Sequence, residues 1–233
     1  FYRKAGVQTD WIGHPLVDTV RAPENRETFA ARYGLDPRLP IVAVLPGSRP
    51  SELAHHMRQL IAAVAQMNAA GQRQFVFAAA PGLTQAQLKA HMAAHGLVIT
   101  TVENATYELL GAAQVAIVSS GTATIEAALL GVPMVVVYRV APFTAWVVRH
   151  LMHTRFFAMV NVLAGKEIVP ELIQDAFTPE RVVRETERLL ASAEARETMR
   201  RELASVREKL GPPGAIERAA DIIAEMIRIQ PVA

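Results

Sequence analysis

The chain contains no cysteine among its 233 residues, which excludes disulfide bonds, thiolate metal ligands and a cysteine nucleophile. Aromatic residues make up only 6% of the sequence, and no run of lysine and arginine stands beside them. With a formal net charge of +2, this distribution argues against a nucleic-acid partner. The seven histidines show no metal-ligand spacing supported by carboxylates, so neither a metal nor another cofactor is expected.

Hydrophobic residues make up 51% of the chain, enough for a sizeable buried core. The sequence opens on Phe1 without an initiating Met and without the layout of a signal peptide, so we expect it to be part of a longer polypeptide. The adjacent residues His55 and His56 fall in a predicted helix, where neighbouring positions point apart. We interpret both as part of a solvated helix face.

Short apolar runs alternate with amphipathic segments along most of the chain. This alternation is typical of an α/β fold with a doubly wound, Rossmann-like parallel sheet. Strands are predicted at residues 41–45, 74–80, 98–102, 115–118 and 134–138, and helices at 18–34, 50–68, 85–95, 105–112 and 122–130. Additional C-terminal helices are predicted at 178–193, 194–210 and 215–229. We divide the chain into a crossing segment (1–15), a main domain (16–210) and a hinge with a terminal amphipathic helix (211–233).

A hydroxyl-rich turn joins the fourth strand to its helix and is the first candidate site. The turn consists of small and hydroxyl-bearing residues: Ser119, Ser120, Gly121, Thr122, Ala123 and Thr124. Unpaired N–H groups at the start of the helix could hold a phosphate, and Glu126 could accept hydrogen bonds from a ribose. The alternative is ordinary capping by the turn and dipole complementation by the glutamate. The apolar neighbours of Glu126 indicate a half-buried carboxylate that needs a partner.

A second polar turn follows the first strand and contains Gly47, Ser48 and Arg49, with Glu52 one turn into the next helix. Ligands of open α/β sheets bind at the carboxyl ends of the strands, so both turns could face one ligand. The Arg49 guanidinium could neutralise the charge that grows on a leaving diphosphate. The alternative is an ion pair between Arg49 and Glu52 without a catalytic role.

An aromatic and basic helix is predicted at residues 143–159. It is too polar and too interrupted to span a bilayer. It could lie on a membrane surface, or it could pack within the protein or between domains.

Several motifs occur together in an order that resembles lipid-A-disaccharide synthase. They are Gly13-His14-Pro15, Leu45-Pro46-Gly47-Ser48-Arg49 with Glu52, Ser120-Gly121-Thr122-Ala123-Thr124 with Glu126, Tyr138-Arg139, Asn161 with Leu163-Ala164-Gly165, and Pro170-Glu171-Leu172-Ile173-Gln174. The resemblance covers nearly the whole chain and implies the C-terminal, donor-binding domain of a GT-B glycosyltransferase. The implied enzyme is inverting and metal-independent, and lies peripherally on the cytoplasmic side of the inner membrane in Gram-negative bacteria.

The resemblance also implies substrates and residue roles. The enzyme would transfer 2,3-diacylglucosamine from UDP-2,3-diacylglucosamine to 2,3-diacylglucosamine 1-phosphate and release UDP. The hydroxyl-rich turn would hold the UDP phosphates, Glu126 the ribose and Arg49 the leaving diphosphate, while Tyr138 and Asn161 complete the predicted substrate-binding set. The general base would lie in an N-terminal domain outside this chain, so we expect nucleotide binding without glycosyl transfer. A membrane surface and a second copy of the chain stay open as partners.

Two alternatives remain from the sequence. One is another UDP-sugar enzyme of the GT-B type, such as the lipid II glucosaminyltransferase or a UDP-sugar epimerase. The other is a nucleotide-binding or dimerisation domain without catalysis, whose affinity for UDP would not depend on Arg49.

Overall fold

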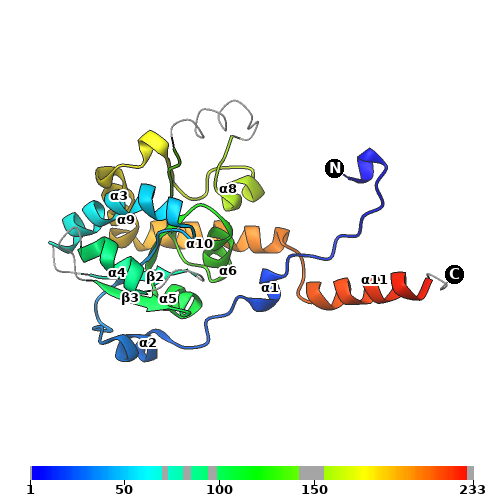
Figure 1. The fold of residues 1–233 in the computed structure, drawn as a ribbon, viewed down its shortest axis with the longest axis horizontal. Coiled ribbons are helices and arrows are strands. Elements are labelled where there is room, and N and C mark those ends of the chain that lie inside the picture. Colours follow the sequence, from blue (N-terminus) through cyan, green and yellow to red (C-terminus); the bar gives the residue numbers. More distant parts are fainter. Residues whose placement is uncertain (1, 70–72, 81–84, 94–98, 142–154, 230–233) are drawn as a thin grey trace.

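The computed structural model describes residues 2–69, 73–80, 85–93, 99–141 and 155–229. In this part of the chain a single six-stranded sheet runs in the order β3-β2-β1-β4-β5-β6, with every neighbouring pair parallel (Figure 1). The strands are β1 (Ile41–Leu45), β2 (Gln74–Ala79), β3 (Thr100–Glu103), β4 (Val115–Ser119), β5 (Met134–Tyr138) and β6 (Glu171–Ile173). The predicted α/β class with a doubly wound parallel sheet is confirmed.

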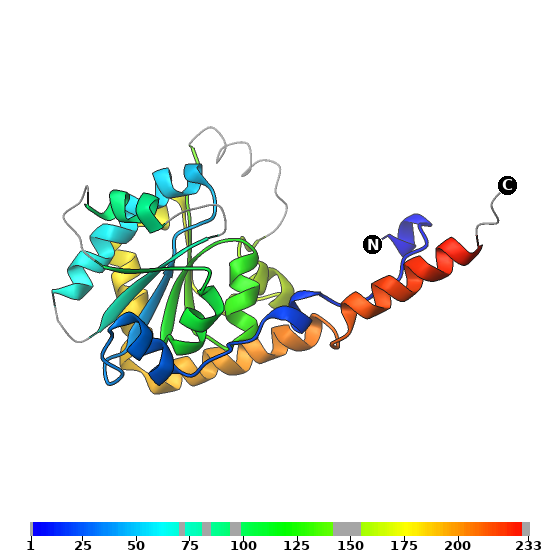
Figure 2. The ribbon, with the colours of Figure 1, turned by 60° about the horizontal axis from the view of Figure 1, so that its bottom comes forward.

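The strand order reverses direction between β1 and β4. From β1 the chain proceeds outward through α3 (Pro50–Asn68) to β2, whereas from β4 it proceeds through α6 (Thr122–Leu129) to β5 on the other side. Because such crossovers are right-handed, the two helices lie on opposite faces of the sheet (Figure 2). This switch point is where ligands of doubly wound sheets bind.

The remaining helices complete the two layers and the C-terminal extension. They are α1 (Leu16–Thr19), α2 (Arg26–Tyr33), α4 (Gln85–Ala93), α5 (Thr106–Ala112), α8 (Met159–Ala164), α9 (Pro179–Ala191), α10 (Ala193–Lys209) and α11 (Ala215–Ile229), with 3-10 turns at Arg3–Ala5 and Gln174–Ala176. α3 packs against α9, and α10 packs against α6, α8 and α9. The predicted C-terminal helices are therefore present, and α11 projects away from the sheet (Figure 2).

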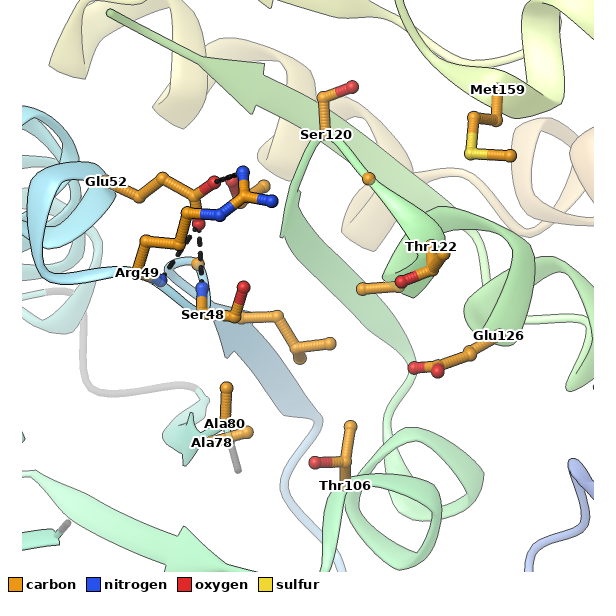
Figure 3. Close-up of a pocket in the computed structure, with 15 residues that line it drawn as sticks. Ser48, Arg49, Glu52, Ala78, Ala80, Thr106, Ser120, Thr122, Glu126 and Met159 are labelled. Atoms are coloured by element: carbon orange, nitrogen blue, oxygen red, sulfur yellow. Dashed lines mark hydrogen bonds and ion pairs between the residues drawn. The ribbon is translucent and has the colours of Figure 1, made fainter. Parts of the chain in front are cut away.

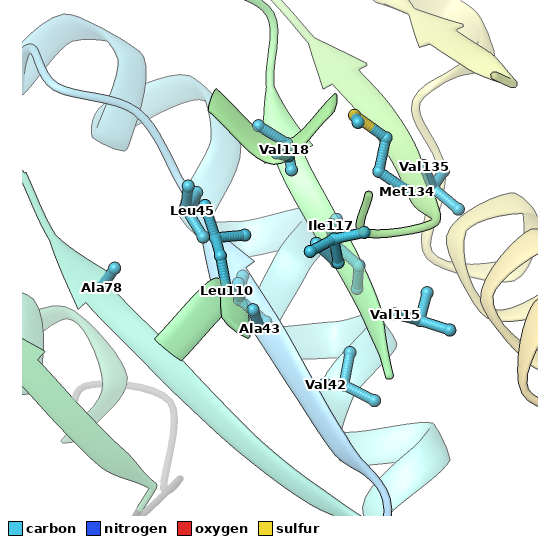
Figure 4. Packing of buried hydrophobic residues seen from close by; sticks show 14 of the residues in the cluster. Val42, Ala43, Leu45, Ala78, Leu110, Val115, Ile117, Val118, Met134 and Val135 are labelled. Atoms are coloured by element: carbon cyan, nitrogen blue, oxygen red, sulfur yellow. The ribbon is translucent and has the colours of Figure 1, made fainter. Parts of the chain in front are cut away.

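The core lies between the sheet and its helices. All five residues of β1 and all five of β4 are buried, so the central strands show continuous apolar runs rather than alternation. Figure 4 shows side chains of both strands packed together, with Ile117 at the centre of the cluster. The register pairs Leu45 with Val118, so the turns after β1 and β4 leave the sheet at the same level.

The structure differs from the sequence-based expectations at a few elements. The single helix predicted at 18–34 is wrong, because α1 ends at Thr19 and α2 begins at Arg26. The Asn25 side chain caps α2 by accepting a hydrogen bond from the N–H of Thr28. β6 was not predicted, because three residues are too few to show a period. Most of the aromatic and basic helix predicted at 143–159 lies outside the described residues. Among the residues that are described, no helix has the length and apolarity needed to cross a membrane.

The packing of β4 predicts a large cost for truncating Ile117, whose side chain is fully buried. Ile117→Ala should lower the free energy of unfolding by about 2 to 5 kcal/mol, because the lost methyl and methylene groups leave a cavity. Lys89→Ala on the exposed side of α4 serves as the control and should change it by less than about 0.5 kcal/mol. Urea unfolding of both variants measures the difference, and equal losses would contradict this account of the core.

Candidate functional site

A cavity of about 550 Å³ opens at the switch point, between the turns that follow β1 and β4. Its volume is within the range of small-molecule sites. Figure 3 shows Ser48 and Arg49 on one side of this space and Thr122 and Glu126 on the other. The lining residues are Leu45, Gly47, Ser48, Arg49, Glu52, Ala78, Ala80, Thr106, Ser119, Ser120, Gly121, Thr122, Ala123, Glu126 and Met159.

The turn after β1 is held by the carboxylate of Glu52. Oε2 of Glu52 accepts hydrogen bonds from the N–H groups of Ser48 (2.8 Å) and Arg49 (3.3 Å). Its Oε1 pairs with Nη1 of Arg49 at 3.3 Å. The Arg49 side chain remains 73% exposed, so this ion pair is weak and the guanidinium can turn toward a ligand in the cavity.

Gly47 is required by the closeness of Glu52. Its φ is +126°, a conformation that L-residues rarely adopt. A Cβ at this position would lie 2.5 Å from Oε2 of Glu52 and 2.8 Å from its Cβ. The glycine thus lets the carboxylate reach the N–H groups at the start of α3.

The turn after β4 leaves the start of α6 open to the cavity. The N-cap is Gly121, which has φ +154° and no side chain to cap the helix. Within the described residues, the N–H groups of Gly121, Thr122 and Ala123 have no hydrogen-bond partner. These donors and the positive end of the helix dipole are the features that can hold an anion at a helix start.

Ser119 adds a further unsatisfied group beside this helix start. Ser119 is only 5% exposed, and its hydroxyl has no hydrogen-bond partner in the described part of the chain. The same residue lines the cavity. Because buried hydroxyls normally find partners, this hydroxyl is a candidate to hydrogen-bond a ligand in the cavity.

Glu126 lines the cavity one turn inside α6. Burial raises the pKa of its carboxyl above the ordinary value, while a hydrogen bond from the Tyr107 hydroxyl, at 3.5 Å, opposes that rise. Burial and the nearby carboxylate likewise raise the pKa of Tyr107. Tyr107 on α5 is therefore the hydrogen-bond partner of Glu126 that the sequence did not reveal. Because this hydrogen bond is long, much of the hydrogen-bonding capacity of the Glu126 carboxylate remains available to a ligand.

Most of the residues predicted for the site line this one cavity. Three predicted residues do not: Thr124, Tyr138 and Asn161. Thr124 is buried, and its hydroxyl donates to the Gly121 carbonyl at 2.7 Å inside the turn. The Tyr138 ring packs against His56 and Phe157, with centroids 5.5 Å and 5.0 Å away.

Asn161 supports the fold rather than lining the cavity, so the prediction of a pocket-lining residue is corrected. Its side chain is fully buried, and Nδ2 donates to the Val169 carbonyl (2.9 Å) and to the Glu171 carboxylate (2.7 Å). Its Oδ1 accepts from the N–H groups of Ile168 and Val169 at 2.8 Å and 3.1 Å. All its polar atoms are thus used within the protein.

The expectation of a solvated face is wrong for His56. This histidine is fully buried, since it falls on the same face of α3 as Leu53, Met57 and Leu60. Its neighbour His55, pointing elsewhere, is half-buried.

Five lining residues were missed by the sequence analysis: Leu45, Ala78, Ala80, Thr106 and Met159. Leu45, Ala78 and Ala80 lie at the carboxyl ends of β1 and β2, and Thr106 begins the helix after β3. The rule that ligands bind at strand ends could have found them. Met159 starts α8, far along the chain, and no local pattern indicates its place.

Comparison with solved structures identifies the class of fold. WaaG, a glycosyltransferase involved in lipopolysaccharide biosynthesis, superposes with a TM-score of 0.57 at 16% identity, over 90% of this chain and 54% of its own. HepE of Anabaena, solved with UDP and glucose, gives 0.56 at 13% identity, over 90% and 53%. The chain has a fold found in GT-B glycosyltransferases.

Sequence comparison identifies the family. A family model described as lipid-A-disaccharide synthetase matches residues 1–225. Lipid-A-disaccharide synthases of Myxococcus xanthus and Acidobacterium capsulatum are 37% and 42% identical, over 97% and 98% of this chain. The chain belongs to the lipid-A-disaccharide synthetase family, as the resemblance indicated, and it spans 60% of the length of these two relatives.

The raised pKa of Glu126 predicts that its charge destabilises the fold at neutral pH. A carboxyl whose pKa is raised on folding favours the folded state when protonated, and this contribution is lost as the pH rises through the folded pKa. Glu126→Gln should therefore raise the melting temperature at pH 7.5 by about 1 to 2 °C, a small effect because solvent still reaches the group. The exposed Glu225→Gln is the control, and a lower melting temperature for Glu126→Gln would contradict the assignment.

Gly47→Ala should destabilise the protein by about 1 to 3 kcal/mol, since both backbone strain and contact with Glu52 oppose the new methyl group. Gly34→Ala is the matched control, because Gly34 also has a positive φ, +67°, but a Cβ there meets nothing within 4 Å. Urea unfolding should show the larger loss at position 47. A loss no larger than that of the control would show that Glu52 does not require the glycine.

Proposed function

We propose that this chain is the donor-nucleotide half of a lipid-A-disaccharide synthase and binds UDP in the cavity at the switch point. The observation that carries the proposal is the open start of α6, where N–H groups and the buried Ser119 hydroxyl on the wall of that cavity have no partner among the described residues. The choice of UDP as the nucleotide follows from the resemblance described above, and the family membership supports it.

The parts of UDP match different walls of the cavity. The diphosphate binds the N–H groups at the start of α6, where the helix dipole favours negative charge. The ribose hydroxyls donate to Glu126, one turn further along. The base lies against the small side chains of Ala78 and Ala80, beside Thr106.

Arg49 supplies the charge that the reaction needs. An acceptor hydroxyl attacks C1 of the donor sugar, the bond from C1 to the phosphate oxygen breaks, and its electron pair leaves with UDP. The hydroxyl proton passes to a general base outside this chain. Because the leaving diphosphate gains charge in the transition state, a guanidinium that moves from Glu52 to the phosphate stabilises that state over the ground state.

The full enzyme transfers 2,3-diacylglucosamine from UDP-2,3-diacylglucosamine to 2,3-diacylglucosamine 1-phosphate, with inversion at C1. Both sugars carry acyl chains, which favours action at a membrane surface, and the family resemblance implies the cytoplasmic side of the inner membrane. The chain spans 60% of the length of its relatives, and we expect it to bind UDP without forming the disaccharide. Disaccharide formed by this chain alone would contradict that expectation.

Binding measurements on the chain test the proposal. Calorimetry should show affinity falling in the order UDP, UMP, uridine, because each removed phosphate loses donors at α6. Arg49→Ala should weaken UDP binding about 3- to 10-fold, as expected for one exposed charge, and leave uridine binding unchanged. Arg38→Ala is the matched control: Arg38 is also paired with an acid, Asp36, but it precedes β1 and so lies at the other edge of the sheet.

The outcomes separate the alternatives. UDP binding that does not change in Arg49→Ala would favour the nucleotide-binding domain without catalysis. No UDP binding by the unmodified chain would refute the proposed function. Glu126→Gln should reduce the preference for UDP over its 2′-deoxy analogue, and an unchanged preference would remove Glu126 from the ribose site.

A further inference from the structure

A buried histidine, His56, connects two separate parts of the wall behind the cavity. Its Nδ1 lies 2.8 Å from the carbonyl oxygen of Pro46, in the turn after β1. Its Nε2 accepts a hydrogen bond from the N–H of Arg139, just after β5, at 2.9 Å. The two contacts together require a neutral ring that carries its proton on Nδ1. The Arg139 carbonyl is 3.1 Å from Nε2, where this neutral ring has no hydrogen to donate.

The contact with Pro46 completes the support of the turn that carries Arg49. Glu52 and His56 lie one turn apart on α3 and face the same way. Glu52 binds the N–H groups at the end of the turn, and His56 binds the carbonyl at its beginning. α3 thus fixes both ends of residues 46–49.

The contact with Arg139 ties this turn to the far side of the sheet. The Arg139 guanidinium donates to the carbonyls of Gln174 and Phe177, both at 2.8 Å. The Phe177 ring also meets the His56 ring edge-on, with centroids 5.6 Å apart. The backbone at the end of β5 is therefore held in place by these hydrogen bonds, and His56 links α3 to it.

A chain of contacts leads from His56 to the phosphate-binding turn. The Tyr138 ring packs between His56 and Phe157, and the carbonyl of Phe157 accepts a hydrogen bond from the Ser120 hydroxyl at 3.4 Å. Ser120 lines the cavity. His56 therefore contacts both the turn that carries Arg49, through Pro46, and the residues that pack behind the Ser120 turn, through Tyr138.

We propose that His56 is a positioning residue that holds the Arg49 turn in register with the exit of β5 and so sets the width across which a diphosphate binds. It does not line the cavity, and it acts through Pro46 and Arg139. This inference rests on the proposed function, because it concerns the same UDP site.

Protonation of His56 would undo this arrangement, since the ring would lose its acceptor for the Arg139 N–H. Burial lowers the pKa of His56, while its hydrogen bonds with the backbone of Pro46 and Arg139, and to a lesser extent the charge of Glu52, oppose that effect. The other titratable groups near it are His55, its neighbour on α3, Tyr138 at the end of β5, and Arg139 just after that strand. Because the pKa is lowered on folding, the neutral ring contributes stability above the unfolded pKa of about 6.5 that is lost as the pH falls.

Three variants separate the two hydrogen bonds. His56→Asn retains a donor near Nδ1, His56→Gln retains an acceptor near Nε2, and His56→Leu retains neither. His56→Leu should weaken UDP binding at pH 7.5 about fivefold, the order expected for one hydrogen bond, with uridine binding changed less than twofold. The Asn and Gln variants should fall between His56→Leu and the unmodified chain. His55→Leu, at the adjacent half-buried position, is the matched control and should bind UDP normally.

A second measurement distinguishes positioning from bulk packing. Between pH 7.5 and 5.5 the unmodified chain should lose more thermal stability than His56→Gln, whereas His55→Gln should follow the unmodified chain. The proposal would be overturned if the affinity of His56→Leu for UDP were within twofold of that of the unmodified chain. If that variant does not fold, UDP binding by His56→Gln and His56→Asn within twofold would overturn it equally. Failure of the unmodified chain to bind UDP would instead refute the proposed function, and this inference with it.

Discussion

The reversal of strand order between β1 and β4 is the constraint on which the site depends. Right-handed crossovers place α3 and α6 on opposite faces of the sheet, so the chain parts at the carboxyl ends of these strands and a cavity opens between them. The register that pairs Leu45 with Val118 brings both following turns to one level. Each turn can then be short, and Arg49 and Thr122 line one cavity from two separate βα units.

The starts of α3 and α6 both line this cavity, and of these two only the start of α6 has N–H groups without partners in the described part of the chain. At α3 the Glu52 carboxylate occupies the N–H groups of Ser48 and Arg49, so the positive end of that helix is already neutralised. At α6 the N-cap is Gly121, which offers no side chain. Under the proposed function, an anion would therefore bind at α6, while the turn before α3 would contribute the exposed guanidinium of Arg49. A capping side chain at position 121 or the loss of Glu52 would change which helix attracts the anion.

The strands and the two polar turns could be predicted because their signals are local. Apolar runs such as residues 41–45 and 115–118 identify buried strands, and the strand-end rule places the turns at one edge of the sheet. The roles of Asn161 and His56 could not be predicted, because their partners lie on other elements: Glu171 and Val169 for the former, Arg139 for the latter. The family resemblance implied a substrate-binding role for Asn161, and local spacing indicated a solvated face for His56; the burial of both side chains changes both interpretations.

The environment of Glu126 is poorly suited to stability and well suited to binding. Burial raises its pKa, and its hydrogen bond from Tyr107 is long at 3.5 Å, so the ionised carboxylate is only partly compensated in the folded chain. Ser119 likewise carries a polar group that the protein does not satisfy, since its hydroxyl is buried without a partner in the described residues. By contrast, the polar atoms of Asn161 and His56, which lie behind the wall, all have partners. Buried unsatisfied atoms also occur away from the cavity, as at Thr186, but the contrast between Glu126 and Ser119 on the wall and Asn161 and His56 behind it is consistent with a polar ligand that completes the hydrogen bonding.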